Sequence, residues 1–223
     1  MRILAIDTVT EACSAALWFD GEVRERFAVE PRRHTELILP MVEELLAEAG
    51  IDLARLDALA VDRGPGSFTG VRVGVGVVQG LALARDLPVH PVSSLAALAM
   101  QAKAPGLVLP MIDARMDEVY WGVYEHAGET VTLHGEEHVT PPQAVRFPAK
   151  VPATALGTGL HAFREHFLTL YPELQIADRA ESPALPRAAE VARLAAAQPP
   201  AAALAAEQIL PVYLRDQVVQ RPA

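Results

Sequence analysis

Residues 56–86, LDALAVDRGPGSFTGVRVGVGVVQGLALARD, constrain the fold of this chain more than any other stretch. Their apolar start predicts a short buried strand that ends at Asp62. The Arg-Gly-Pro-Gly turn that follows cannot continue the strand, because glycine adopts backbone angles that other residues avoid and proline lacks an amide donor. Ser67 or Thr69 can then cap a helix that begins near Gly70. The sequence therefore predicts a strand, a tight turn and a helix, in this order.

The predicted helix over residues 70–84 has an unusual surface. Arg72 and Gln79 are its only large polar side chains, and at about 100° per residue they point in nearly the same direction. The glycines at positions 70, 74, 76 and 80 each weaken a helix by about 1 kcal/mol relative to alanine. Close approach of another backbone would offset this loss. Two explanations stay open: the helix is buried wholly within its own fold, or one glycine face meets a partner protein.

A second helix, predicted over residues 35–49, also carries more apolar surface than one sheet can cover. Glutamates occupy the rest of its circumference, and Gly50 is expected to end it. Pro40 predicts a kink or a later start. His34 stands at the start of this helix, where a histidine either caps and packs or serves as a ligand.

The composition limits the function classes. The 223 residues suffice for one large domain or two small lobes, and a hydrophobic content of 51% is ample for a packed core. A net charge of −9 argues against binding nucleic acid alone, because lysine and arginine contacts to phosphate dominate that affinity. Cys13 is the only cysteine, so the chain forms no internal disulfide and no cysteine-rich metal site.

The N-terminal sequence and the longest apolar run indicate where in the cell the protein is expected. The N-terminal sequence MRILAIDT predicts a first strand rather than a signal peptide. The longest weakly polar run, residues 73–84, is too short to span a bilayer and contains Gln79. We therefore expect a cytoplasmic protein without membrane association.

The order of predicted elements indicates an internal duplication. Three strands open the chain, over residues 2–6, 13–19 and 22–29. The same pattern of strand, polar loop and hairpin recurs with strands over residues 107–112, 119–124 and 130–133. An Ala-Pro-Gly breakpoint at residues 104–106 separates the two parts. We therefore expect an α/β protein with a first lobe over residues 1–104 and a second lobe over residues 105–223, whose C-terminal tail packs back.

Acids stand at the ends of two predicted strands. Asp7 follows the first strand, where it is either a catalytic acid or a structural turn residue. The loop after Asp7 contains no glycine, which hinders close approach of backbone amides to a phosphate. Asp113 and Asp117 flank Arg115, so this group either supports acid–base chemistry or forms a carboxylate–arginine ion pair.

The sequence gives little support for metal binding. His134 and His138 have the spacing of a helical metal pair, but Gly135 and strand-like flanks argue against a helix there. No complete set of metal ligands is visible, which also argues against a metallopeptidase.

Motifs along the whole chain are similar to one known family. They are ILAIDTVTEACSAAL, RRHTELILPMVEELL, RGPGSFTGVRVGVGVVQGLALA, MIDARMDEVYWGVY, LGTG and PVYLR. They resemble the TsaB (YeaZ) family, which belongs to the bacterial machinery that installs N6-threonylcarbamoyladenosine next to the tRNA anticodon. The resemblance implies a two-lobed actin/hexokinase/Hsp70-like (ASKHA) fold, with ribonuclease-H-like sheets flanked by helices.

The resemblance also implies a role and partners. It implies a scaffold without transferase activity of its own, which heterodimerises with the catalytic paralogue TsaD and activates it, assisted by the ATPase TsaE. tRNA is then bound only through the complex, and this chain needs no cofactor because ATP and Mg²⁺ are bound mainly by the partners. In isolation the chain can form a homodimer through the same face, since two like surfaces can substitute for each other, and a monomer is the open alternative.

The residues themselves allow a check on the absence of activity. TsaD-like relatives carry a His-x-x-x-His metal pair on the helix that follows the strand after the glycine-rich helix. Ser94 and Leu98 stand at those positions here, and neither replaces an imidazole as a metal ligand. Only Gly157 and Gly159 remain of a glycine-rich adenine-binding turn. The resemblance therefore implies that the fold is kept without its metal site and with weakened nucleotide binding.

Two candidate sites follow. The apolar faces of the two helices are expected to form a bundle with the equivalent helices of the paralogue, with about 800 Å² buried per partner. The expected interface residues are Leu37, Ile38, Met41, Val42, Leu45, Gly70, Val73, Gly74, Val77 and Leu81. A vestigial nucleotide site is expected at Asp7, Thr8, Gly64, Gly66, Ser67, Asp113, Gly157 and Gly159. The alternative function is an ATP-dependent kinase or ATPase of the same fold that uses Asp7, Gly64, Gly66 and Asp113.

Overall fold

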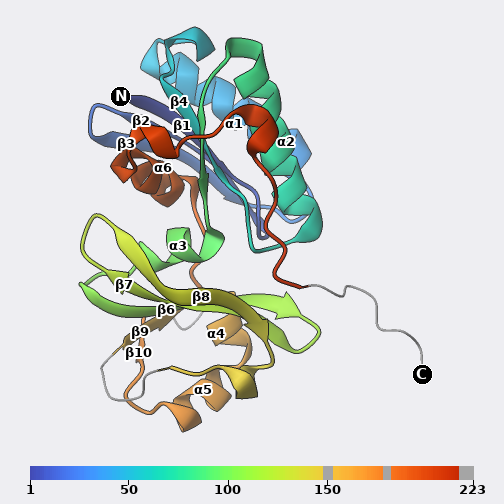
Figure 1. Cartoon of the computed structure of the whole chain (residues 1–223). Coiled ribbons are helices and arrows are strands. Elements are labelled where there is room, and N and C mark those ends of the chain that lie inside the picture. Colours follow the sequence, from blue (N-terminus) through green and yellow to red (C-terminus); the bar gives the residue numbers. More distant parts are fainter. Residues whose placement is uncertain (148–152, 178–181, 216–223) are drawn as a thin grey trace.

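The computed structural model describes residues 1–147, 153–177 and 182–215, and these form two five-stranded sheets, one above the other in Figure 1. The strand orders are β3-β2-β1-β4-β5 and β10-β9-β6-β7-β8. When the second order is read from β8, both sheets show the same arrangement. Three antiparallel strands form a meander, and a further strand lies parallel to the first strand of that meander. The internal duplication and the α/β class predicted from the sequence are therefore confirmed.

The first sheet is built from the predicted N-terminal strands and the strand before the glycine turn. Its strands are β1 (Arg2–Asp7), β2 (Ala12–Phe19), β3 (Glu22–Val29), β4 (Ala58–Asp62) and β5 (Val89–Val92). In the central strand β1, Leu4 and Ile6 belong to one apolar cluster, whereas Ile3 and Ala5 belong to another. Successive side chains of a strand point to opposite faces of its sheet, so a strand that is apolar at every position must be covered on both faces.

Two helices cover one face of this sheet. They are α1 (His34–Ala49) and α2 (Phe68–Arg85), which pack through Ile38 and Val42 of α1 and Val71, Val75 and Val78 of α2. α1 contains Pro40 and still begins at residue 34, so the later start allowed by the sequence is wrong. Its predicted end is confirmed, because the residue at position 50 is a glycine in the left-handed conformation.

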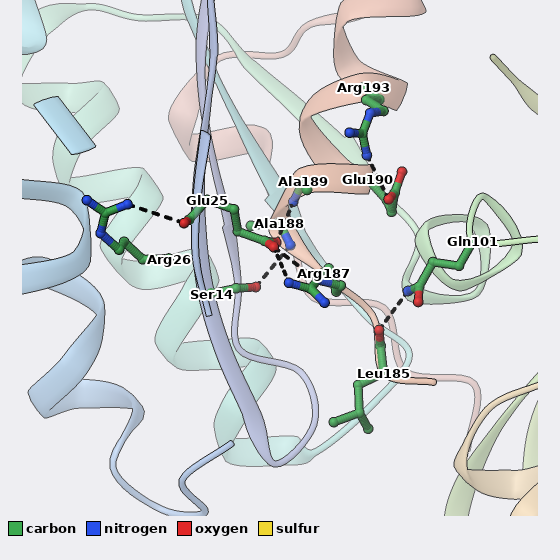
Figure 2. A network of polar contacts seen from close by, with 10 residues as sticks. All are labelled: Ser14, Glu25, Arg26, Gln101, Leu185, Arg187, Ala188, Ala189, Glu190 and Arg193. Atoms are coloured by element: carbon green, nitrogen blue, oxygen red, sulfur yellow. Dashed lines mark hydrogen bonds and ion pairs between the residues drawn. The ribbon is translucent and has the colours of Figure 1, made fainter. Parts of the chain in front are cut away.

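Helix α6 (Ala188–Ala197) covers the other face, as Figure 2 shows in detail. Ser14 Oγ accepts a hydrogen bond from the Ala188 amide at 2.9 Å, and Glu25 Oε1 accepts one from the Ala189 amide at 3.0 Å. The other carboxylate oxygen of Glu25 pairs with the Arg187 guanidinium at 2.5 Å. These contacts satisfy amides at the start of the helix that have no partner within it. The division at residue 105 assigned this helix to the second lobe, and the correction is that it packs on the first sheet.

The second sheet uses the strands predicted after residue 106. They are β6 (Gly106–Arg115), β7 (Glu118–His126), β8 (Val131–Thr140), β9 (Ala153–Leu156) and β10 (Gln175–Ile176). Helices α4 (Thr158–Ala162) and α5 (Arg164–Leu170) pack on one side, with Leu160 and Phe167 in the core. Helix α3 (Ser94–Ala99) lies between the two sheets, on the other side (Figure 1). The predicted lobe boundary falls between α3 and β6 and stays a prediction.

One expectation for the second lobe needs correction. The strand predicted over residues 130–133 continues as β8 through residue 140, past a left-handed glycine at position 135. His134 and His138 therefore lie on a strand, as their flanks indicated, and His138 stacks on Trp121 with ring centroids 4.8 Å apart. After β9, the helices α4 and α5 meet at the non-helical residue Phe163.

The segment 204–215, called the C-terminal strap below, runs from the first lobe to the second beside α2 (Figure 1). Gln79 Nε2 of α2 donates to the carbonyl oxygens of Ala206 at 3.2 Å and Ile209 at 2.9 Å. In the second lobe, Arg215 Nη2 donates to the Ala114 carbonyl at 3.2 Å, and Arg215 also pairs with the Glu118 carboxylate. The strap thus fixes α2 and ties the two lobes together. Four short 3₁₀ helices complete the described elements: Leu53–Arg55, Pro142–Ala144, Pro200–Ala202 and Ala206–Gln208.

Candidate functional site

The inner side of α2 is built around two of its glycines. Ser67 Oγ accepts from the Gly70 amide at 3.4 Å, which caps the helix at the predicted position. A Cβ placed on Gly70 would lie 2.1 Å from the Thr8 carbonyl oxygen, and one on Gly74 would lie 2.7 Å from Thr8 Oγ1. Thr8 Oγ1 in turn donates to the Gly70 carbonyl at 2.7 Å. These two glycines therefore let α2 approach the end of β1 within the chain's own fold.

The outer side of α2 carries the other two glycines. Gly76 and Gly80 are exposed, and nothing lies within 4 Å of a Cβ placed on either. Leu83, one turn further on, is 70% exposed, and Val73 and Val77 beside them are partly buried. We call Val73, Gly76, Val77, Gly80 and Leu83 the outer stripe of α2. No contact within the described fold requires glycine at positions 76 and 80.

The expected interface residues divide into two groups. Five of them are covered by the chain's own core: Ile38, Val42, Leu45, Gly70 and Gly74. The other five are partly buried: Leu37, Met41, Val73, Val77 and Leu81. The correction is that Gly70 and Gly74 are buried and face Thr8 of the chain's own fold. Gly76, Gly80 and Leu83 were not among the expected interface residues, although their helical spacing places them on one face. Leu39 of α1, which is 46% exposed, was not among them either.

A cleft of about 1130 Å³ lies between the two lobes. The start of α2 and the loop after β1 form one wall, the end of β6 with α4 forms the other, and Tyr213 and Arg215 of the strap contribute to the lining. The charged residues that line it are Glu11, Arg32, Arg72, Asp113, Arg115 and Arg215. Arginines outnumber acids in this cleft, although the chain as a whole has a net charge of −9. The cleft therefore favours an anionic group over a cationic one.

Most of these arginines already have partners. Arg115 Nη1 lies 2.9 Å from Asp113 Oδ2, and the Arg115 amide donates to the other oxygen of the same carboxylate at 2.8 Å. This is the carboxylate–arginine ion pair left open by the sequence, and Asp117 has no part in it. Arg72 stacks on Phe68, with its guanidinium carbon 3.3 Å from the ring centroid, and on Tyr213 at 4.9 Å. An anion would therefore enter a cleft whose cations are largely engaged.

The residues predicted as a vestigial nucleotide site do not converge on the cleft. Gly66, Ser67 and Asp113 line it. The other five lie behind its surface: Asp7, Thr8, Gly64, Gly157 and Gly159. A Cβ on Gly157 would lie 2.2 Å from the Met111 carbonyl oxygen, and one on Gly159 would lie 3.0 Å from the backbone of Ile112. These two glycines pack α4 against β6 rather than forming an open turn.

Asp7 is sealed inside the protein rather than presented to the cleft. It ends β1, is 1% exposed, and lies beside Asp62, which ends the adjacent parallel strand β4 and is fully buried. Burial raises the pKa of Asp7 to about 7. Burial, and secondarily the neighbouring Asp7, raise the pKa of Asp62 well above its ordinary value. A catalytic acid must reach its substrate, and Asp7 does not reach the cleft.

Other candidate ligands are engaged in structural contacts. Ser94 Oγ donates to Asp62 Oδ1 at 2.5 Å, and Leu98 is fully buried. His34 Nε2 lies 2.9 Å from the Thr10 carbonyl oxygen. Among the residues that the structure describes, no three side chains of His, Cys, Asp or Glu gather as a metal site would require. No helix in the described ranges is long and apolar enough to cross a membrane.

Comparisons with known proteins agree with the resemblance found in the motifs. Residues 28–221 match the family model described as TsaD: tRNA N6-adenosine threonylcarbamoyltransferase. An Escherichia coli protein called tRNA threonylcarbamoyladenosine biosynthesis protein TsaB is 43% identical over 98% of this chain and 96% of its own length. A Haemophilus influenzae protein of the same name is 39% identical over 98% and 95%. The solved structure of YeaZ from Pseudomonas aeruginosa has a TM-score of 0.85 at 43% identity, covering 96% of this chain and 99% of that one.

Proposed function

Since this chain belongs to the TsaB (YeaZ) family of tRNA threonylcarbamoyladenosine biosynthesis proteins, we propose that it is a non-catalytic subunit that binds the catalytic paralogue TsaD and holds it active. The match to the TsaD family model supports paralogy between the two subunits. In this proposal the outer stripe of α2 and the adjoining part of α1 form the docking surface. TsaE, ATP and Mg²⁺ act on TsaD, and this chain requires no cofactor of its own.

The observation that carries the proposal is the outward glycine pair. Gly76 and Gly80 reduce the intrinsic stability of α2 by about 1 kcal/mol each relative to alanine, and no atom of the described fold occupies the space beside them. Gly70 and Gly74 differ, because the chain fills the space beside them itself. A second helix approaching the outer stripe would use the notch at Gly76 and Gly80, with Leu83 covered at its end. In isolation, a second copy of the chain could pair through this stripe by two-fold symmetry.

The interior of the molecule supports the absence of catalysis. The acid at the end of β1 is buried away from the cleft, and Ser94 and Leu98 occupy the positions of the relatives' metal pair. With a net charge of −9, the chain by itself is poorly suited to bind tRNA, so tRNA would bind to the assembled complex. A protein of this pathway would act where tRNA is modified, which we take to be the cytoplasm.

A reconstituted reaction tests the proposal. The reaction contains purified TsaD, TsaE, tRNA and the substrates of threonylcarbamoylation, and it is run with and without this chain. The modified adenosine is quantified by mass spectrometry. We expect efficient modification only when the chain is present, and none from the chain in the absence of TsaD. Equal modification without the chain, or turnover by the chain alone, would contradict the proposal.

The alternative, an ATP-dependent kinase or ATPase, has one observation in its favour, the arginine-lined cleft. Its discriminating test is calorimetry of the isolated chain with ATP and Mg²⁺. Micromolar binding together with hydrolysis would favour the enzyme. An Arg72→Ala variant, which removes a cleft cation that pairs with no carboxylate among the described residues, would then bind ATP more weakly.

A further inference from the structure

The two buried acids behind the cleft form a pair that the proposed function does not use. β1 and β4 are parallel neighbours with Ile6 opposite Val61, so Asp7 and Asp62 leave the sheet side by side. Both side chains are at most 1% exposed. The two carboxyl groups lie close enough for each to affect the pKa of the other. Two carboxylates only accept hydrogen bonds, so a hydrogen bond between them needs a proton on one of them.

The hydrogen bonds to each oxygen lead to the same result. Asp7 Oδ1 accepts from the Val9 amide at 3.0 Å, and Asp62 Oδ1 accepts from the Gly64 amide at 2.9 Å and from Ser94 Oγ at 2.5 Å. The two Oδ2 atoms are buried and accept no hydrogen bond from any described residue. Leaving two buried carboxylate oxygens without a donor is costly, whereas one proton between them satisfies both.

No cation among the described residues compensates the pair. The charged and titratable groups that act on it from the neighbouring elements are Glu25 of β3, Cys13 of β2 and Tyr124 of β7. Glu25 is an acid, and burial, followed by the charge of Asp7, raises the pKa of the Cys13 thiol to about 11. A doubly ionised pair would place two negative charges together in a low-dielectric interior that supplies only neutral donors.

The pair also lies where the lobes meet. Ser94 binds Asp62 of the first lobe, while the preceding residue, Ser93, donates through its hydroxyl to the carboxylate of Glu137 on β8. The Tyr124 hydroxyl donates to the same Glu137 oxygen at 2.5 Å. The start of α3 is therefore held between a carboxyl pair of the first lobe and a carboxylate of the second.

We propose that Asp7 and Asp62 share a proton in the folded protein, and that this proton makes the junction of the two lobes a pH-sensitive lock. With the proton in place, the strand ends of β1 and β4 stay together and hold Ser94. When it leaves, the two carboxylates repel each other and the hold on the start of α3 weakens. The lock depends only on this chain and does not rest on the proposed binding of TsaD.

The sign of the pH effect follows from linkage. The folded pair keeps a proton that the unfolded chain releases above about pH 4. The pair's contribution to stability is therefore full below that pH and declines as the pH rises. Each proton retained only in the folded state raises the unfolding equilibrium constant about tenfold per pH unit.

Asp62→Asn is the informative variant. Its amide oxygen can accept from Gly64 and Ser94, and its NH₂ group can donate to Asp7 without titrating. Urea unfolding is measured for wild type and variant between about pH 5 and 8. The ratio of the wild-type to the variant unfolding constant should rise about tenfold per pH unit. Asp52→Asn, at an exposed carboxyl, is the matched control and should follow wild type.

Carbon-13 NMR of the aspartate carboxyl groups in the wild-type protein tests the same proposal without a variant. We expect one carboxyl of the Asp7–Asp62 pair to stay protonated at pH 7, and amide exchange at Ser94, corrected for its intrinsic rate, to quicken as the pair ionises. The proposal is overturned if both carboxyl groups ionise near the ordinary aspartate value. It is also overturned if the unfolding profiles of wild type and Asp62→Asn run parallel.

Discussion

Replacing Gly76 and Gly80 together with alanine should make the isolated chain more stable. Each glycine costs an α-helix about 1 kcal/mol relative to alanine, and a Cβ at either position meets no atom within 4 Å. The double variant should therefore gain about 2 kcal/mol. For a chain of this size, that raises the midpoint of thermal unfolding by about 4–8 °C. Circular dichroism at a dilution where the chain is monomeric by sedimentation measures this shift.

The matched control is the inward glycine of the same helix, Gly70. Its Cβ would lie 2.1 Å from the Thr8 carbonyl oxygen, so Gly70→Ala must displace backbone and should lower stability by about 1–3 kcal/mol. Opposite shifts from two alanine substitutions in one helix would separate the two kinds of glycine. A fall in the unfolding midpoint for the Gly76→Ala, Gly80→Ala variant would refute the reasoning, because the outward glycines would then be required by the chain's own fold.

The remaining predictions concern the strap, the thiol and self-association. Arg215→Ala removes the ion pair to Glu118 and the hydrogen bond to a β6 carbonyl, and it should lower the free energy of unfolding by about 2 kcal/mol, measured in urea. Cys13 should react with a thiol reagent at pH 8 at least about a hundredfold more slowly in the folded protein than in urea, because burial raises its pKa to about 11; equal rates would contradict this. If the isolated chain dimerises through the outer stripe, Leu83→Asp should abolish the dimer in sedimentation velocity, whereas Leu168→Asp, at an exposed leucine of α5, should not.

The strands of this fold could be read from the sequence because their apolar runs are bounded by residues that end a strand. Asp7 and Asp62 end two buried runs, and both are the last residues of their strands in the structure. β8 was predicted to end at residue 133, whereas it continues past the left-handed Gly135, which lies at an irregularity within the strand pair. From a single sequence, a glycine that ends a strand cannot be distinguished from one that lies at such an irregularity.

The orientation of α2 could not be predicted, for a physical reason. A helix that is apolar nearly all round has little amphipathicity to fix its inner face. Gly70 and Gly76 look alike in the sequence, and only the position of Thr8 against the helix distinguishes them. Gln79 was an ambiguous signal as well, since its polar group is satisfied by the C-terminal strap rather than by solvent.

The placement of α6 shows a second limit. Its amphipathic pattern predicts a buried face but not which sheet buries it. Ser14 and Glu25, which bind the first amides of α6, lie more than 160 residues away in sequence. The sealed position of Asp7 has a similar origin, because Asp7 is buried beside Asp62 at the end of β4, which is distant in sequence. Contacts of this range are set by tertiary packing, so an acid at a strand end could not be assigned as catalytic or structural from its neighbours alone.

The central claim is that the outer stripe of α2 docks TsaD, and calorimetric titration of TsaD into this chain tests it most directly. Gly80→Gln fills the notch with a side chain that a free helix surface tolerates, and Ala197→Gln makes a similar change at an exposed position of α6. We predict that Ala197→Gln binds as wild type does and that Gly80→Gln binds at least about tenfold more weakly, a loss of about 1.4 kcal/mol or more. Equal affinity of all three proteins, with Gly80→Gln folded, would contradict the account.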